Sequence, residues 1–218
     1  MRERVTAVGP NTSLADRKRR AGQRLFIGFQ GHAVTDELRA LTRELRPAGF
    51  ILFARNVAEP AQVLDLNREL AALCDPASPA ILSVDQEGGR VQRVREPATV
   101  WPPMRAVGRA EVDAYEVGLA MGRELRAMGF HLDFAPVADV DSNPANPIIG
   151  DRSFSERPEE VAKHILRFAH GLHTAGVASC VKHFPGHGDT HQDSHLTLPV
   201  VEKELPDLER CELFPFKA

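Results

Sequence analysis

The stretch "LRAMGFHLDFAPVADV" at positions 125–140 decides the fold class. It joins the end of an amphipathic segment to a run that is apolar almost throughout, and Gly129 stands at the junction. Glycine readily adopts the left-handed conformation that ends a helix, so the chain can pass directly from a helix into a strand. A continuously apolar run is typical of a strand covered on both faces in a parallel sheet. The stretch therefore predicts a helix-to-strand joint of an α/β fold.

The same joint occurs twice more, as "LRPAGF" with Gly49 and as "LHTAGV" with Gly176, and we expect each glycine to close its helix. Thr35 is suited to cap one predicted helix, and Pro60 fits the first turn of the next. Apolar runs and helical periodicity define the remaining elements. Strands are predicted at 25–29, 50–54, 80–85, 131–140 and 177–181, and helices at 35–46, 59–73, 111–128 and 157–175.

Repeated β/α units favour either a doubly wound sheet or a (β/α)8 barrel. No strand is followed by the G-x-G-x-x-G fingerprint of a dinucleotide-binding doubly wound fold. Polar residues instead follow the strands, where barrel enzymes place their chemistry: Asp85, Arg93, Asp139, Lys182 and His183. We therefore predict an α/β fold of the (β/α)8 TIM type. About five units are visible where a closed barrel needs eight in ~250 residues, so residues 1–218 are predicted to form a single catalytic barrel domain, truncated at its C-terminus.

Composition argues against several classes of partner. The net charge is −3, whereas nucleic-acid-binding proteins usually show a basic excess. No apolar run approaches the roughly 18 residues that a membrane-spanning helix needs, and the N-terminal segment holds no apolar signal region. Cys74, Cys180 and Cys211 are widely separated and form no metal-type pair, which is typical of reduced thiols. The sequence predicts a cytoplasmic protein without a nucleic-acid or membrane partner, and it does not specify an oligomeric state.

The segment "KHFPGHGDTHQDSH" (182–195) carries histidines at a regular spacing of four. On a helix they would share one face, and histidines four residues apart can bind zinc. Pro185, Gly186 and Gly188 interrupt the run and oppose a helix, so we expect a glycine-rich loop. A metal site assembled by that loop remains one interpretation of its four histidines: His183, His187, His191 and His195.

A catalytic interpretation of the same loop is more specific. In "DSH", Asp193 lies two residues before His195. An aspartate can accept a hydrogen bond from one imidazole nitrogen, and its charge favours the protonated ring. The other nitrogen is then available to protonate a leaving group near neutral pH. The pair is a candidate general acid/base.

Five motifs occur in order at predicted strand ends: "GFILFARN" (49–56), "DQEGGRVQR" (85–93), "DFAPVADV" (133–140), "GDRSF" (150–154) and "KHFPGHGDTHQDSH" (182–195). Together they resemble glycoside hydrolase family 3, and within it the bacterial β-N-acetylhexosaminidase branch. The long glycine- and histidine-rich loop that ends in "DSH" is the most specific of them. The resemblance extends from about residue 24 to the C-terminus.

The resemblance implies removal of terminal β-linked N-acetylglucosamine by a two-step retaining mechanism, without a cofactor or metal. It implies His195 as acid/base and Asp193 as its partner. The terminal sugar would be held by Asp85, Arg93, Arg152, Lys182 and His183. The nucleophile of the family is an aspartate after a later strand, expected beyond residue 218. The branch further implies a muropeptide-like carbohydrate substrate in cell-wall recycling.

Three other interpretations stay open at this point. A family relative can transfer the sugar to phosphate instead of water, which would make the protein a phosphorylase. A metal-dependent hydrolase would use the histidine-rich loop as ligands. A non-catalytic remnant would keep the sugar-binding residues but lack turnover. The unassigned nucleophile leaves three explanations for the chain: a fragment or truncated gene product, a partner chain that supplies the rest, or an inactive remnant.

Overall fold

The computed structural model describes residues 13–110, 112–190 and 200–218. Within these residues, parallel strands form one five-stranded sheet in the order β1 (Phe26–Ile27), β2 (Gly49–Leu52), β3 (Ile81–Val84), β6 (Leu132–Asp133) and β7 (Ala178–Ser179). Each strand therefore pairs with the next of these strands along the chain. A doubly wound sheet reverses direction at a switch point, and this sheet does not. The α/β fold of barrel type, incomplete at five strands, is confirmed.

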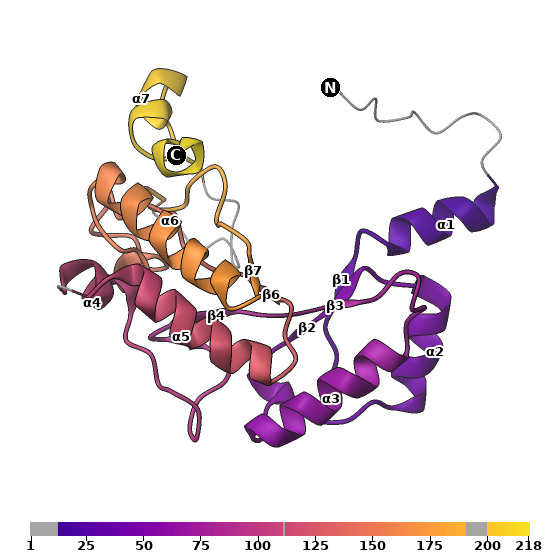
Figure 1. The fold of residues 1–218 in the computed structure, drawn as a ribbon. Helices are drawn as coiled ribbons and strands as arrows, with labels where there is room; N and C mark the ends of the chain where they lie inside the picture. The colour runs from indigo at the N-terminus through magenta and orange to yellow at the C-terminus, as the bar shows by residue number, and fades with distance from the viewer. Residues whose placement is uncertain (1–12, 111, 191–199) are drawn as a thin grey trace.

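Helices connect successive strands of the sheet. The connections contain α2 (Asp36–Leu45), α3 (Pro60–Ala72), α4 (Met104–Arg109) with α5 (Ala114–Ala127), and α6 (Pro158–Thr174). α1 (Leu14–Gly22) precedes the sheet, and α7 (Leu205–Arg210) and α8 (Phe214–Lys217) follow it. Figure 1 shows α2 and α3 on one flank and α5 and α6 on the other, so that the chain forms an open arc. None of the described helices is long and apolar enough to cross a bilayer.

The structure confirms most of the predicted helix ends. Thr35 Oγ1 accepts a hydrogen bond from the Leu38 N–H at 3.2 Å and caps α2. Pro60 occupies the first turn of α3. Gly129 and Gly176 have φ values of +84° and +82° directly after α5 and α6, the left-handed conformation that the two joints require.

The prediction for Gly49 was wrong. α2 ends earlier, at Leu45, and its C-cap residue Arg46 adopts the left-handed conformation with φ of 49°. A proline follows Arg46 and disfavours a helical conformation there. Gly49 lies inside β2, where an added Cβ would be 2.2 Å from the Ile81 carbonyl oxygen. The close approach of β2 and β3 therefore explains why this position needs a glycine.

The predicted strand at 131–140 forms a shorter ladder than its apolar run indicates. Only Leu132 and Asp133 pair with both neighbours, and an isolated bridge links Val137 to Lys182 farther along. Pro136 lies between these points and has no N–H to donate to a ladder. The run is apolar because most of its side chains are buried, not because all of it pairs with neighbouring strands.

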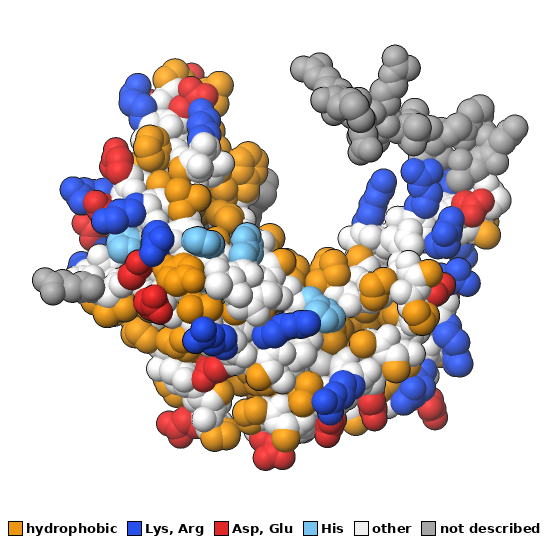
Figure 2. Space-filling view, viewed as in Figure 1, with side chains coloured by type: hydrophobic (Ala, Val, Ile, Leu, Met, Phe, Trp, Pro, Cys, Tyr) orange, Lys and Arg blue, Asp and Glu red, His pale blue; other side chains and the backbone are white. Residues whose placement is uncertain are grey.

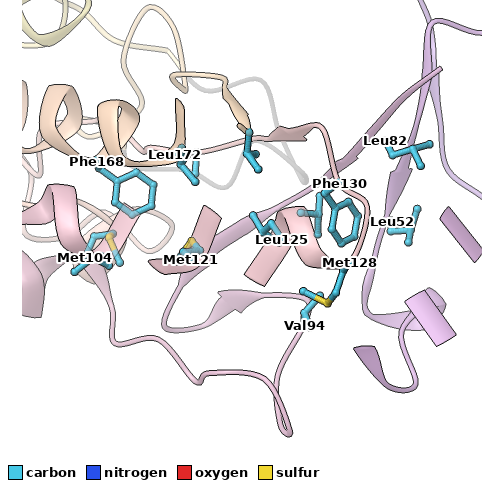
Figure 3. Packing of buried hydrophobic residues seen from close by; sticks show 14 of the residues in the cluster. Leu52, Leu82, Val94, Met104, Met121, Leu125, Met128, Phe130, Phe168 and Leu172 are labelled. Carbon is cyan, nitrogen blue, oxygen red and sulfur yellow. The ribbon is translucent and has the colours of Figure 1, made fainter. Parts of the chain in front are cut away.

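The hydrophobic core lies between the sheet and the helices of both flanks (Figure 3). Leu52 and Leu82 belong to β2 and β3, whereas Met121 and Leu125 belong to α5, and all are at most 1% exposed. Each such side chain contributes about 1.5–3 kcal/mol when fully buried. The packed core therefore holds the strand ends in fixed positions. The polar residues that follow the strands are positioned by it.

Candidate active site

A cavity of about 320 Å³ lies beyond the ends of β3 and β7, on the hollowed side of the molecule that Figure 2 shows. All five residues that the resemblance implied as sugar-binding line it: Asp85, Arg93, Arg152, Lys182 and His183. Four further residues complete the wall: Glu87, Val91, Ile148 and His187. Asp85 and Lys182, which are 97 positions apart in the sequence, are thus brought to one place. The carboxyl ends of parallel strands meet at one edge, which explains this convergence.

A larger cavity of about 440 Å³ lies before the strands, among the C-terminal ends of α1, α2 and α3. Its wall includes Arg43 in the last turn of α2 and Arg46 at the cap of that helix. Cations at a helix C-terminus complement the partial negative charge of its last carbonyls. Because barrel enzymes use this face for stability rather than chemistry, we place the functional site in the smaller cavity.

Asp85 directly follows β3 and pairs with two cations. Its Oδ1 is 2.8 Å from Lys182 Nζ, and its Oδ2 is 3.3 Å from Arg93 Nη2. Burial alone raises the pKa of Asp85, but the Lys182 ammonium and then the Arg93 guanidinium outweigh it and hold this pKa below its ordinary value. The carboxylate is therefore ionised at neutral pH. The stability that it contributes is lost only as the pH falls through the lowered folded-state pKa.

Glu87 is a second buried carboxylate of the site, and it was not among the residues predicted from the sequence. Its oxygens accept from Arg152 Nε and Nη2, each at 2.8 Å, and one of them lies 2.6 Å from Lys182 Nζ. Burial acts to lower the pKa of Arg152, but the hydrogen bonds and charge of Glu87 overcome this and raise that pKa above its ordinary value. Glu87 lies in the "DQEGGRVQR" motif two residues after Asp85, a signal that could have drawn attention to it.

Asp139 is the third carboxylate, fully buried behind His183. Its Oδ2 lies 2.6 Å from His183 Nδ1, and its Oδ1 accepts the His187 N–H at 2.6 Å. The other ring nitrogen of His183 is 3.3 Å from Arg152 Nη2. The sequence placed Asp139 after a predicted strand but assigned it no role.

The site combines carboxylates with cations. Asp85 and Glu87 pair with Arg93, Arg152 and Lys182, and Asp139 pairs with His183. Each cation offers donors, and the carboxylates offer acceptors. Such a set suits a neutral ligand with many hydroxyl groups better than it suits an anion or a cation.

Comparison with known proteins shows the family of the chain. Residues 19–218 match the family model described as the glycosyl hydrolase family 3 N-terminal domain. The chain belongs to glycosyl hydrolase family 3. It is 47% identical over 175 residues to a beta-hexosaminidase of Methylococcus capsulatus, a match that covers 78% of this chain and 51% of that protein.

Two solved family 3 structures are similar in fold. A β-N-acetylglucosaminidase from Paenibacillus sp. str. FPU-7 is 43% identical with a TM-score of 0.88, covering 94% of this chain and 39% of that one. NagZ from Neisseria gonorrhoeae, in complex with N-trifluoroacetyl-D-glucosamine, is 39% identical with a TM-score of 0.81, covering 87% of this chain and 58% of that one. The chain spans about half the length of the curated relatives it matches.

The histidine-rich loop of this family 3 chain is described as far as Thr190. Residues 183–190 contain no helix, which confirms the loop prediction for this described part of the segment. Asn146 Nδ2 donates to the carbonyls of His187 and Gly188 at 2.7 and 3.1 Å. Gly188 lies so close to the 131–140 segment that an added Cβ would be 1.6 Å from the Val140 carbonyl oxygen. The first part of the loop is therefore held directly against the core.

The predicted acid/base pair, Asp193 and His195, lies outside the described residues, as does His191. Its role stays a prediction. Among the residues that the structure describes, no group of three histidine, cysteine or acidic side chains could hold a metal ion. The four-histidine metal site also stays untested, because only His183 and His187 of its members are described.

Asp133 and Asp141 do not line the cavity. Asp141 pairs with Arg105 at 2.6 Å. Asp133 is fully buried in β6, where its Oδ1 accepts the Gln86 N–H and its Oδ2 has no partner among the described residues. Burial raises the pKa of Asp133 well above its ordinary value of 3.8, despite the opposing hydrogen bond from Gln86.

We expect Asp133→Asn to remove a pH dependence of stability. The unfolded chain loses the proton near the ordinary pKa, whereas the folded protein keeps it, so the wild type loses up to about 1.4 kcal/mol per pH unit between the two pKa values. Asparagine is neutral throughout. Urea unfolding at pH 5 and pH 8 should therefore show the variant gaining stability relative to the wild type as the pH rises. A difference that stays constant would contradict a protonated Asp133.

Proposed function

We propose that this chain is the N-terminal part of an exo-β-N-acetylhexosaminidase that removes terminal β-linked N-acetylglucosamine. The observation that carries the proposal is the convergence of five predicted sugar-binding residues on one cavity of a family 3 domain. The names of the curated and solved relatives support the same substrate class. The N-trifluoroacetyl-D-glucosamine bound to the Neisseria protein supports it as well.

The proposed roles follow from the chemistry of each group. Asp85 accepts hydrogen bonds from sugar hydroxyls, while Arg93, Arg152 and Lys182 donate to sugar oxygens. His195, oriented by Asp193, protonates the glycosidic oxygen as the bond breaks and later deprotonates the attacking water. The nucleophile that forms the covalent sugar intermediate is an aspartate that follows Ala218. Cytoplasmic location, a muropeptide-like substrate and independence of metal belong to the same proposal.

The first test compares two proteins: the chain ending at Ala218 and the chain extended through the sequence that follows it in the gene. We expect the extended protein to hydrolyse an aryl β-N-acetylglucosaminide and the shorter chain to be inactive, because the proposed nucleophile is not among its residues. His195→Ala in the extended protein should lower turnover about 10²–10⁴-fold for substrates with poor leaving groups. Good leaving groups need little protonation, so their turnover should fall much less.

The same assay separates the alternatives. Equal loss for good and poor leaving groups would refute His195 as the acid. Loss of activity in a chelator, restored by zinc, would favour the metal-dependent hydrolase. Release of a sugar 1-phosphate in phosphate buffer would indicate a phosphorylase. An extended protein that binds N-acetylglucosamine without turnover would be a sugar-binding remnant.

A further inference from the structure

We propose that Asp139 is a positioning residue that holds His183 as one neutral tautomer and ties the histidine-rich loop to the sugar cavity. Asp139 has no exposed surface and does not line the cavity, so any effect on a ligand must pass through its neighbours. This inference rests on the proposed function for its kinetic part only.

The tautomer follows from the partners of the two ring nitrogens. Arginine carries donors and no acceptor, so the His183 Nε2 that faces Arg152 Nη2 at 3.3 Å must present its lone pair. The proton then resides on Nδ1, which donates to Asp139 Oδ2 at 2.6 Å. A doubly protonated ring would set an N–H against the Arg152 guanidinium. The neutral Nδ1–H form is the one form that satisfies both contacts.

The consequence for a ligand is specific. His183 Nε2 presents an acceptor to the cavity beside the donors of Arg152 and Lys182. Its single lone pair already accepts from Arg152 Nη2, so a sugar hydroxyl can donate to His183 only by replacing that donor, and Nε2 has no proton to donate to a sugar oxygen.

The second oxygen of Asp139 acts on the loop. Oδ1 accepts the His187 N–H at 2.6 Å, so one carboxylate fixes both ends of the turn from His183 to His187. Asp139 is anchored in turn, because Ser153 Oγ donates to its backbone carbonyl at 2.6 Å. Asp139 thus fixes the start of the loop that leads in the sequence to His195, and the same residue orients His183. We expect its removal to change activity about 10–100-fold, the range found for carboxylates that orient metal-binding histidines.

Asp139→Asn is the variant that tests the proposal. All three groups that face the carboxylate are donors: His183 Nδ1–H, the backbone N–H of His183 at 3.4 Å and the backbone N–H of His187. The amide of asparagine has only one acceptor oxygen, so either orientation sets its NH₂ against a donor. Asp141→Asn is the matched control, because Asp141 lies two residues away and pairs with Arg105 outside the cavity.

The first readout is the tautomer of His183 in the 218-residue chain, measured by NMR with ¹⁵N-labelled histidine rings. We expect the Nδ1–H form in the wild type and in Asp141→Asn, and a mixture of forms in Asp139→Asn. A wild-type His183 that is protonated, or that carries its proton on Nε2, overturns the proposal even if the Asp139 variant fails to fold.

The second readout is kinetic and uses the extended protein. We expect Asp139→Asn to lower kcat/KM about 10–100-fold, and Asp139→Glu, which keeps the charge, to recover part of it. Unchanged tautomer and kinetics in Asp139→Asn would overturn the proposal. If the extended wild type hydrolyses no N-acetylglucosaminide, the proposed function fails, and the tautomer measurement still decides the role of Asp139.

Discussion

Glu87→Gln is expected to lower the free energy of unfolding by about 3–5 kcal/mol and to abolish most activity of the extended protein. Glu87 is only 2% exposed and binds the Arg152 guanidinium through both oxygens, with Lys182 at 2.6 Å. Glutamine removes the charge and sets an NH₂ group against a donor of Arg152. A buried guanidinium is then left without its counter-ion, which costs more than the pair itself contributes. Urea unfolding and turnover of an aryl N-acetylglucosaminide measure the two effects.

The double variant Glu87→Leu with Arg152→Met separates stability from function. Replacing both members of a buried pair by apolar residues leaves no unpaired charge from it, so stability should largely recover. Lys182 keeps Asp85 as its partner at 2.8 Å. Activity should stay low, because Arg152 no longer lines the cavity. Asp65→Asn is the control for an exposed pair, with Asp65 76% exposed beside Arg68, and it should change stability by at most about 1 kcal/mol. If Glu87→Gln is as stable as the wild type, the Glu87–Arg152 pair is exposed to solvent in the protein, and the prediction is wrong.

Gly188→Ala is expected to reduce turnover of the extended protein about 10²-fold. The new methyl group would overlap the Val140 carbonyl oxygen at 1.6 Å, so the loop backbone must move away from the core. Displacement of a catalytic group by about 1 Å can cost this much in rate. Stability should fall by about 1–3 kcal/mol, as is usual when a packed site receives an extra carbon. Steady-state kinetics and urea unfolding give both values.

Gly176→Ala is the matched control for this variant. Gly176 has a positive φ, so alanine costs about 1–2 kcal/mol in backbone strain. Its Cβ would meet no atom closer than 3.8 Å, and it lies at the other end of β7 from the cavity. We expect this variant to lose stability but keep its turnover. Equal turnover in Gly188→Ala and Gly176→Ala would show that the loop position does not limit catalysis.

Local patterns in the sequence were sufficient to predict most elements of the fold. The cap at Thr35 and the first-turn proline at Pro60 act within one turn of their own helix, so the nearby sequence predicts them. The prediction failed at Gly49, because a neighbouring strand explains that glycine rather than its own helix. The run at 131–140 failed in part for the same reason: its apolar character reports burial and not strand pairing.

The five predicted sugar-binding residues came from motifs at strand ends, and the parallel sheet brought them to one cavity. Glu87 was not predicted, and Asp139 was placed at a strand end without a role, although both lie inside motifs at those strand ends. Their partners are 65 and 44 residues away in the sequence, at Arg152 and His183. No spacing rule connects such residues, so their pairing could not be read from one chain.

The sequence by itself determined the order of strands and helices, the barrel-type winding and the family, because short-range spacing and apolar runs encode them. Only the tertiary structure decided which charged groups pair: Asp85 with Lys182, Glu87 with Arg152, and Asp139 with His183. The physical reason is that hydrogen bonds and ion pairs act over a few ångströms in space. Folding alone brings Asp85 to Lys182 across 97 residues of chain.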